Sequence, residues 1–460
     1  MSQTIGFYGA AETVTGSRHL LSIGKHKVLV DCGLFQGGRQ LKERNWDPFP
    51  VDPSEIDAVV ITHAHADHIG LLPRLVAQGF HGPIYATPGT TELSRISLPD
   101  SGRIQEEDAH FANKHKTSRH TPALPLYTER DAYEALKHFK PVHYRTPHEL
   151  PGGATFTFTP AGHILGSAFA AITFQDGTRL MMSGDLGRYN TPIICDPSPV
   201  ESTDYLVIES TYGDRIHSHE DPLEKIEHVL RGIMQTGGAL VIPSFAIGRT
   251  QELLYYFRIL QDQGRMPRIP IYIDSPMAVS VTHVYANSSE DLDEEMTASV
   301  KAGRSELEPE GITFVRDREL SKALNSQRGP LVIISGSGMA NGGRVTHHLQ
   351  HRMPDPSTVV LFTGYQAEGT LGRRLLDGAP MVHIHGQEVQ VRAQIERVNA
   401  LSAHADQEEM MTWLGGFKSP PKQTFIVHGE PDAQEALQAK IEHDLGWSTV
   451  IPKQGDSFNL

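Results

Sequence analysis

A chain of 460 residues is too long for one ordinary hydrophobic core, so it is expected to fold as two or three domains. No apolar run approaches the roughly 18 residues that are needed to span a bilayer. The only cysteines are Cys32 and Cys195, which excludes a disulfide framework and a cysteine-rich zinc finger and predicts a cytoplasmic location. The net charge of -14 argues against a protein that coats nucleic acid, although a cleft that contains metal cations can still bind a few nucleotides.

In the first 210 residues, short apolar runs end in polar side chains and alternate with helical patterns. The runs at 28–30, 58–62 and 206–208 lead into Asp31, His63 and Glu209. Such runs are typical of buried strands that deliver side chains to one rim of a sheet. A helical pattern at 131–138 lies between them, and the alternation predicts an α/β fold.

The segment 211–391 has a strand–helix pattern of its own. Strands are expected at 239–243, 270–274, 331–335 and 358–363, and helices at 222–235 and 249–260. The last stretch, 392–460, carries a further apolar run at 425–427 that leads into His428. We therefore expect one domain made of residues 1–210 and 392–460, interrupted by an inserted α/β domain.

Four side chains of the metal-ligand type lie within the six residues His63-Ala64-His65-Ala66-Asp67-His68. His63 and His65 point the same way while the chain is extended, since side chains alternate along a strand. A helix is expected to begin near Ile69, and the turn into it can direct Asp67 and His68 toward a second point. Imidazole and carboxylate suit Zn²⁺.

This motif resembles the signature of the metallo-β-lactamase superfamily, and Asp31 in VLVDCG, His163 in PAGHILGS and Asp185 in MMSGDLG follow the family's order. The resemblance implies a four-layer αββα sandwich and two Zn²⁺ ions per chain, with Mn²⁺ as an alternative. The first ion would be held by His63, His65 and His163, and the second by Asp67 and His68. Asp185 would bridge the two ions, and Asp31 would orient the histidine loop.

The sequence also resembles the β-CASP group of this superfamily, which processes nucleic acids. Glu209 in VIESTYGDR, His404 in LSAHADQ and His428 in IVHGE match its additional motifs, and the insertion matches its second domain. Histidine at the last motif is typical of RNA-processing members, such as ribonuclease J and the cleavage subunit of the pre-mRNA 3′-end processing factor. His428 would then complete the second zinc site, and the substrate would be single-stranded RNA.

The resemblance implies hydrolysis of a phosphodiester bond by a hydroxide that bridges the two metal ions, since bound metal lowers the pKa of water. Asp67 is expected to orient this nucleophile as well as bind metal. His404, oriented by Glu209, is the candidate acid beside the leaving oxygen. For Glu209 alone, a helix cap or a surface salt bridge would be the simpler interpretation.

Two glycine-containing loops of the insertion are candidates for phosphate binding, because they follow predicted strands and precede helices. The residues are Ser244 and Arg249 in one loop, and Ser335, Ser337, Gly338 and Arg344 in the other. A turn that serves only packing remains the alternative for each loop. Phe245 and Tyr365 are candidates for stacking on bases, although isolated aromatic residues more often belong to the core.

Two other functions stay open at this point: a small-molecule hydrolase such as a thioesterase or lactonase, and a non-catalytic RNA-binding subunit. The superfamily includes such hydrolases, so the fold alone does not decide the substrate. The choice between exonuclease and endonuclease activity, and the existence of a homodimer, are not settled by the sequence.

Overall fold

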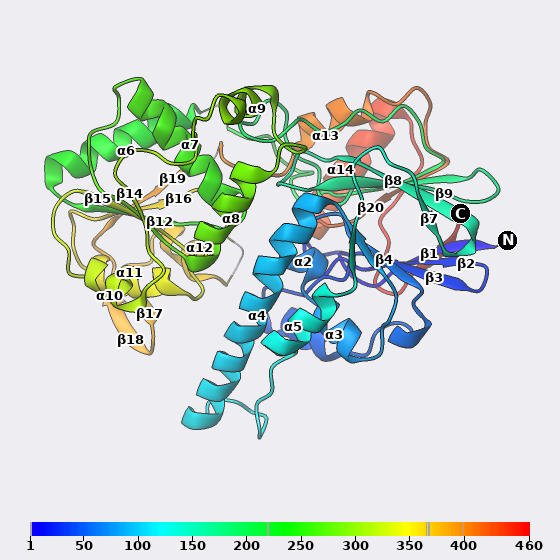
Figure 1. Cartoon of the computed structure of the whole chain (residues 1–460), viewed down its shortest axis with the longest axis horizontal. Coiled ribbons are helices and arrows are strands. Elements are labelled where there is room, and N and C mark those ends of the chain that lie inside the picture. The colour runs from blue at the N-terminus through cyan, green and yellow to red at the C-terminus, as the bar shows by residue number, and fades with distance from the viewer. Residues whose placement is uncertain (1, 219, 365, 367–368, 399) are drawn as a thin grey trace. The chain divides into compact units, whose positions relative to one another are not determined.

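The computed structural model describes residues 2–218, 220–364, 366, 369–398 and 400–460 (Figure 1). Tyr365 lies outside the described residues. The chain divides into two compact units. The first unit is Met1–Ile216 with His404–Leu460, and the second is His217–Ala403.

The first unit contains two seven-stranded sheets, with strand orders β22-β1-β2-β3-β4-β5-β6 and β21-β20-β11-β10-β9-β8-β7. The strands of the first sheet are β1 (Gln3–Phe7), β2 (His19–Ile23), β3 (His26–Val30), β4 (Ala58–Val60), β5 (Ile84–Ala86), β6 (Phe139–Pro141) and β22 (Ser457–Asn459). Those of the second sheet are β7 (His148–Leu150), β8 (Ala154–Pro160), β9 (Ala168–Thr173), β10 (Arg179–Met182), β11 (Tyr205–Ile208), β20 (Gln423–Ile426) and β21 (Thr449–Val450).

Helices form the outer layers of this unit. They are α1 (Arg39–Glu43), α2 (Ala66–Ile69), α3 (Leu72–Ala77), α4 (Pro88–His115), α5 (Glu129–Leu136), α13 (Gln407–Leu414) and α14 (Pro431–Leu445), with short 3-10 turns at Arg44–Trp46, Pro53–Glu55 and Pro151–Gly153. Helices α3, α4 and α5 lie on the side of β4, and α13 and α14 lie on the side of β20 (Figure 1). This arrangement confirms the predicted αββα layers.

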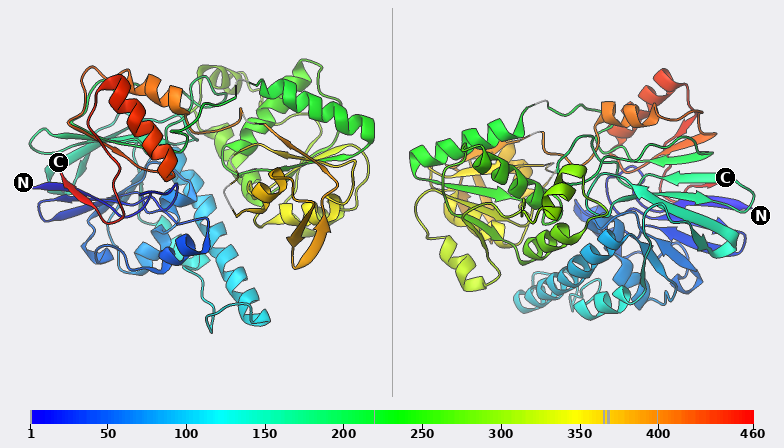
Figure 2. Two further views of the ribbon diagram at one scale, coloured as in Figure 1. Left: turned by 180° about the vertical axis from the view of Figure 1, so that it is seen from behind. Right: turned by 45° about the horizontal axis from the view of Figure 1, so that its top comes forward.

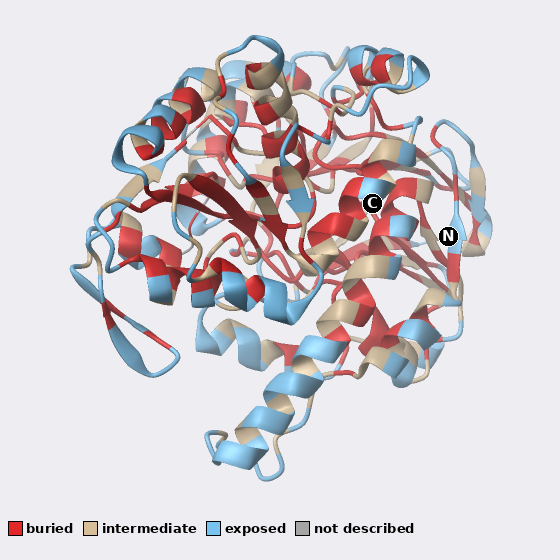
Figure 3. Ribbon diagram, turned by 60° about the vertical axis from the view of Figure 1, so that its left-hand side comes forward, coloured by how far each residue is buried: buried red, intermediate tan, exposed pale blue. Residues whose placement is uncertain are grey.

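Two apolar cores hold these layers together. Phe7, Phe156 and Phe425 lie between the two sheets, where they are removed from water. Trp413 and Leu437 pack α13 and α14 against the other face of the second sheet. The central strands of the sheets in both units are buried (Figure 3).

The two ends of the chain meet in the first sheet. Strand β22 pairs antiparallel with β1, so that Thr4 lies opposite Asn459 (Figure 2). Residues from both ends of the sequence are therefore needed to complete the first unit.

The second unit is built on a six-stranded parallel sheet, with strand order β14-β13-β15-β12-β16-β19. Its strands are β12 (Ala239–Pro243), β13 (Ile271–Asp274), β14 (Ile312–Phe314), β15 (Leu331–Ser335), β16 (Val359–Phe362) and β19 (Gln394–Arg397), beside the hairpin β17 (Met381–Ile384) and β18 (Gln387–Gln390). Its helices are α6 (Pro222–Thr236), α7 (Arg249–Asp262), α8 (Pro276–Asn287), α9 (Glu294–Lys301), α10 (Arg318–Leu324), α11 (Arg344–Arg352) and α12 (Leu371–Leu376).

Both faces of this sheet are covered, as parallel sheets require. Leu240 and Ile242 of β12 join the core with α6, α7 and α8, whereas Val241 between them joins the core with α11 and α12. The sequence placed the end of the insertion near Val391. Strand β19 nevertheless pairs with β16, so the second unit continues past that residue.

Most predicted elements agree with the structure to within a few residues. Strands β12 and β15 have the predicted bounds, and helices α5, α6 and α7 occupy the predicted segments. The helix expected to begin near Ile69 instead begins at Ala66, with His65 at its N-cap. In the described part of the chain, no helix combines the length and apolar character needed to cross a bilayer.

Candidate metal centre

The histidine motif lies at the end of a fully buried strand. Strand β4 leads through Ile61 and Thr62 into His63, and α2 starts three residues later at Ala66. The loop is packed tightly against the segment after β3, because a Cβ atom on Gly33 would lie 1.6 Å from the carbonyl oxygen of Asp67. Glycine at position 33 is therefore required for this approach.

Asp31 holds this loop from behind. Its carboxylate accepts hydrogen bonds from the backbone N–H of Thr62 at 2.9 Å and from the Thr62 hydroxyl. The Oδ2 atom of Asp31 also lies 2.7 Å from His68 Nδ1. A carboxylate on one imidazole nitrogen fixes the ring so that the other nitrogen faces the opposite direction. This geometry supports the orienting role expected for Asp31.

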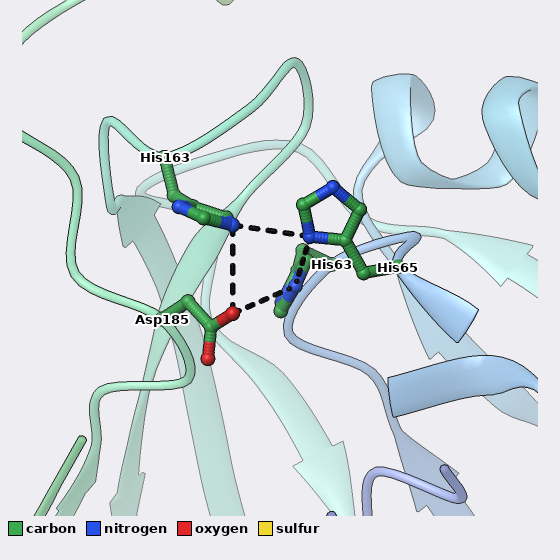
Figure 4. Close-up of side chains that lie close together, drawn as sticks. All are labelled: His63, His65, His163 and Asp185. Carbon is green, nitrogen blue, oxygen red and sulfur yellow. Dashed lines mark hydrogen bonds and ion pairs between the residues drawn. The ribbon is translucent and has the colours of Figure 1, made fainter. Parts of the chain in front are cut away.

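Four ligand-type side chains form a first cluster in the same unit (Figure 4). His65 Nδ1 lies 3.1 Å from His63 Nε2 and 3.1 Å from His163 Nε2. Asp185 Oδ2 lies 3.3 Å from His63 Nε2 and 3.4 Å from His163 Nε2. Their ligand atoms therefore converge on one point.

A second cluster consists of Asp67, His68 and His428. His68 Nε2 lies 3.3 Å from His428 Nε2, which is also 3.3 Å from Asp67 Oδ2. The second oxygen of Asp185, Oδ1, lies 3.2 Å from His68 Nε2. The two oxygens of Asp185 thus face the two clusters, as expected of a bridging ligand.

Burial favours the neutral form of the imidazole rings in the first cluster, since it lowers the pKa of each. Burial and the neighbouring His63 lower the pKa of His65 to about 3, and burial and the neighbouring His404 hold the pKa of His163 well below its usual value. In the second cluster, burial also opposes charge on His68, but the carboxylates of Asp185 and Asp31 raise its pKa well above the usual value.

These contacts fit divalent cations. Two imidazole nitrogens that face each other share at most one proton, so they satisfy each other poorly. Asp185 Oδ1 is buried and lies 3.2 Å from His68 Nε2, but not in the geometry of a hydrogen bond. Neutral imidazoles and a buried carboxylate directed at one point are typical of a zinc site. Across both clusters, the structure brings together all seven predicted ligands: His63, His65, Asp67, His68, His163, Asp185 and His428.

Glu209 and His404 form a pair beside the first cluster. Glu209 directly follows β11 and is completely buried, and its carboxylate accepts a hydrogen bond from the backbone N–H of Leu186 at 2.7 Å. His404 Nδ1 lies 3.0 Å from Glu209 Oε1. Burial opposes the charge on His404, but the carboxylate of Glu209 raises the pKa of the imidazole to about 9. The pairing with Glu209 therefore favours the charged form of His404.

The candidate phosphate-binding residues lie in the second unit, at the carboxyl ends of β12 and β15. Ser335 and Ser244 are buried, and the Ser335 hydroxyl donates to the carbonyl of Asp274 at 2.9 Å. Arg344 donates to Asp274 Oδ1 at 2.7 Å, and Arg249 forms an ion pair with Glu252.

Ser337 and Gly338 lie in the loop between β15 and α11. Phe245 is 40% exposed and lies against this loop, because a Cβ atom on Gly338 would meet its ring at 2.6 Å. The phosphate-binding role of this loop and of the residues at the ends of β12 and β15 remains a prediction.

Two residues near the centre were not predicted. The Thr62 hydroxyl lies 3.2 Å from His63 Nδ1 as well as bonding to Asp31. The Thr211 hydroxyl lies 3.2 Å from His428 Nδ1. Each threonine is adjacent to, or two residues from, a predicted site residue, and this proximity is the only signal in the sequence.

Three family models match the chain. Residues 20–183 match a metallo-beta-lactamase superfamily domain, residues 250–375 a Beta-Casp domain, and residues 388–452 a Zn-dependent metallo-hydrolase RNA specificity domain. Together they cover segments from both units.

Several curated proteins are similar along nearly the whole chain. Ribonuclease TTHA0252 of Thermus thermophilus is 40% identical over 432 residues, which cover 94% of each protein. An RNase J-like protein of Methanocaldococcus jannaschii is 28% identical and covers 98% of each. Transcription termination factor FttA of the same organism is 30% identical over 99% of this chain and 71% of its own length.

A solved structure supports the fold alone. The crystal structure of a protein of unknown function from Enterococcus faecalis V583 superposes with a TM-score of 0.56 at 12% identity and covers 100% of both chains.

Proposed function

Because this chain belongs to the β-CASP family of metallo-β-lactamase-fold hydrolases, we propose that it is a metal-dependent ribonuclease that hydrolyses phosphodiester bonds in RNA. The observation that carries this function is the convergence of seven imidazole and carboxylate side chains on two adjacent points. The names of the similar ribonucleases and the RNA specificity domain support RNA as the substrate.

We further propose that the two clusters hold two Zn²⁺ ions, with Mn²⁺ as the alternative. His63, His65 and His163 would hold the first ion, and Asp67, His68 and His428 the second, with Asp185 shared between them. Bound metal ions would supply a nucleophile at neutral pH and stabilise charge on the phosphate oxygens.

The protein's own side chains would act on this substrate in two ways. Asp67 belongs to the second cluster, where its carboxylate would orient an attacking water. The leaving oxygen of RNA needs a proton, and His404 can donate one because Glu209 keeps its ring charged and in a fixed orientation. Glu209 would thus position His404 without touching RNA.

The full donor set favours an enzyme over a non-catalytic RNA-binding subunit. A protein that only bound RNA would have no need for seven converging ligand-type side chains, five of them buried, since burying such groups costs folding free energy. A thioesterase or lactonase remains the alternative within the same chemistry. We also propose a cytoplasmic location and a homodimer.

The test is cleavage of end-labelled single-stranded RNA by the purified protein, with its metal content measured. We expect about two metal ions per chain and a ladder of RNA cleavage products. Chelation should abolish cleavage, and added Zn²⁺ or Mn²⁺ should restore it. The ladder, read from both ends, also separates exonuclease from endonuclease cleavage. Full activity in His63→Ala would refute the metal assignment, and turnover of a thioester but not of RNA would refute the substrate.

A further inference from the structure

The far end of helix α4 is exposed and basic in a chain that is acidic overall. Residues 109–124, which we call the α4 tip, contain Lys114, Lys116 and Arg119 and no aspartate or glutamate. The whole chain has 41 basic against 55 acidic side chains, so the charge of the α4 tip is opposite in sign to that of the whole protein. The three cations are exposed, and this end of α4 extends away from the buried layers (Figure 3).

The α4 tip has a defined conformation. Helix α4 ends at His115, and Lys116 takes the left-handed conformation that closes its last turn. The Asn113 side chain donates to the carbonyl of Ala123 at 2.9 Å and accepts from the backbone N–H of the same residue at 2.7 Å. These two bonds hold the segment that follows α4 beside the helix. Because this segment is already ordered, binding of a ligand to its cations costs less conformational entropy.

Two large apolar side chains are also presented there. Phe111 is 57% exposed and Leu124 is 64% exposed. The Phe111 ring lies 4.3 Å from the ring of His115, measured between centroids. Cations interleaved with an exposed aromatic ring suit a single strand, because the cations bind phosphates and the ring stacks on a base.

We propose that the α4 tip is a docking surface for single-stranded RNA, separate from the metal centre. This inference rests on the proposed ribonuclease function. The other end of α4 adjoins the loop that carries His163, since the hydroxyls of Thr87 and Thr90 donate to the carbonyl of Gly166 at 2.7 and 2.8 Å. A helix of 28 residues is roughly 40 Å long, so only a long RNA reaches both ends.

The test compares a long substrate with a short one. The variant Lys114→Ala/Lys116→Ala/Arg119→Ala would be assayed on an unstructured RNA of about 30 nucleotides and on the small phosphodiester bis(p-nitrophenyl) phosphate. We expect the KM for RNA to rise about tenfold with little change in kcat, and the turnover of the small diester to be unchanged. The slope of log affinity against log salt should fall by about 2, since each lost phosphate contact contributes about 0.7 for a single strand.

A matched control is available in the same unit. Lys25, Lys140 and Lys453 are exposed, and Lys25→Ala/Lys140→Ala/Lys453→Ala removes the same charge. This control should leave the KM for RNA within about twofold of the wild type if the effect is local. Phe111→Ala should weaken RNA binding about fivefold without changing the salt slope, because stacking releases no counterions.

Several results would overturn the inference. An equal rise in KM in both triple variants would show a general charge effect, and an unchanged KM in the α4 variant would show that the tip does not contact RNA. Loss of binding to anionic vesicles or to an acidic polypeptide, with RNA kinetics intact, would assign the surface to a different partner. A wild-type protein that binds RNA through the tip but cleaves none would retain the inference and refute the ribonuclease.

Discussion

Two buried aspartates, one in each unit, lie at or just after the end of a strand and close to histidine. The hydrogen bonds around their carboxylates differ. Asp274, the last residue of β13, accepts hydrogen bonds from Ser321 Oγ at 2.5 Å and Arg344 Nη1 at 2.7 Å, and lies 2.7 Å from His348 Nε2. Asp185, which follows β10, has its Oδ1 3.2 Å from His68 Nε2, but not in the geometry of a hydrogen bond. The first carboxylate is satisfied by the protein, and the second is not.

The difference separates a structural network from a binding site. Donors and acceptors around Asp274 match, and burial is outweighed by the hydrogen bonds from His348, Ser321 and Arg344, which lower the pKa of Asp274. Around Asp185, several imidazole nitrogens face the carboxylate and one another, so their protons and lone pairs are not all matched, an arrangement that costs free energy unless a cation joins them. A cluster of charged side chains is therefore evidence for a ligand only when its polar atoms do not satisfy each other.

The largest expected effect follows from Asp185→Asn. Removing the shared carboxylate should reduce RNA cleavage about ten thousandfold and lower the bound metal, because both ions would lose a charged ligand. Metal analysis and single-turnover kinetics measure this. Asp432→Asn, an exposed change on α14, is the control and should behave as wild type. Normal metal content and activity in Asp185→Asn would contradict the interpretation that Asp185, unlike Asp274, belongs to a binding site.

His404→Ala should reduce kcat about a hundredfold to a thousandfold while metal stays bound, because the acid beside the leaving oxygen is lost. The pKa of His404 is raised to about 9, so the acid form is present below that pH and wild-type kcat should fall as the pH rises through it. The variant should lack this decrease. Glu209→Gln should shift the decrease to lower pH, and a profile identical to that of the wild type would contradict the assigned role of the pair.

Asp274→Asn should affect stability rather than chemistry. Breaking a buried charge network costs about 3 kcal/mol of unfolding free energy, measurable by urea denaturation, while metal content should stay the same. Because the pKa of Asp274 is lowered, this loss should be complete at neutral pH and should shrink as the pH falls below about 4. Asp377→Asn, which removes an exposed pair with Arg373, should cost about 0.5 kcal/mol or less.

Thr62→Val should give the smallest effect. The Thr62 hydroxyl supports Asp31 and the rings of the histidine loop, so its loss should weaken metal binding about tenfold to a hundredfold. Competition with a chelator measures this affinity. Thr62→Ser keeps the hydroxyl and should restore wild-type binding, whereas failure of serine to do so would indicate that only the packing of the methyl group matters.

Much of this organisation could be predicted from sequence, because strand ends are visible as apolar runs that stop at polar residues. The runs before His63, Glu209 and His428 correspond to β4, β11 and β20, and their ends deliver the side chains to one place. The family resemblance then supplied the pairing of ligands, which spacing alone could not.

Other features depend on contacts that spacing does not encode. Thr62 and Thr211 are ordinary residues until the fold brings Asp31 and His428 against them. Arg344 resembles a phosphate ligand in sequence, but its guanidinium contacts Asp274, which lies 70 positions earlier in the chain. The continuation of the second unit through β19 depends on its pairing with β16, which no local pattern reveals.

The placement of β20 between β11 and β21 has a consequence for biosynthesis. Ribosomes deliver the chain from its N-terminus, so residues 217–403 emerge before His404 and His428 do. A nascent polypeptide therefore lacks His404, the proposed general acid, and His428, a proposed metal ligand, until translation is nearly finished. Maturation of the nuclease is delayed by the order of its own strands.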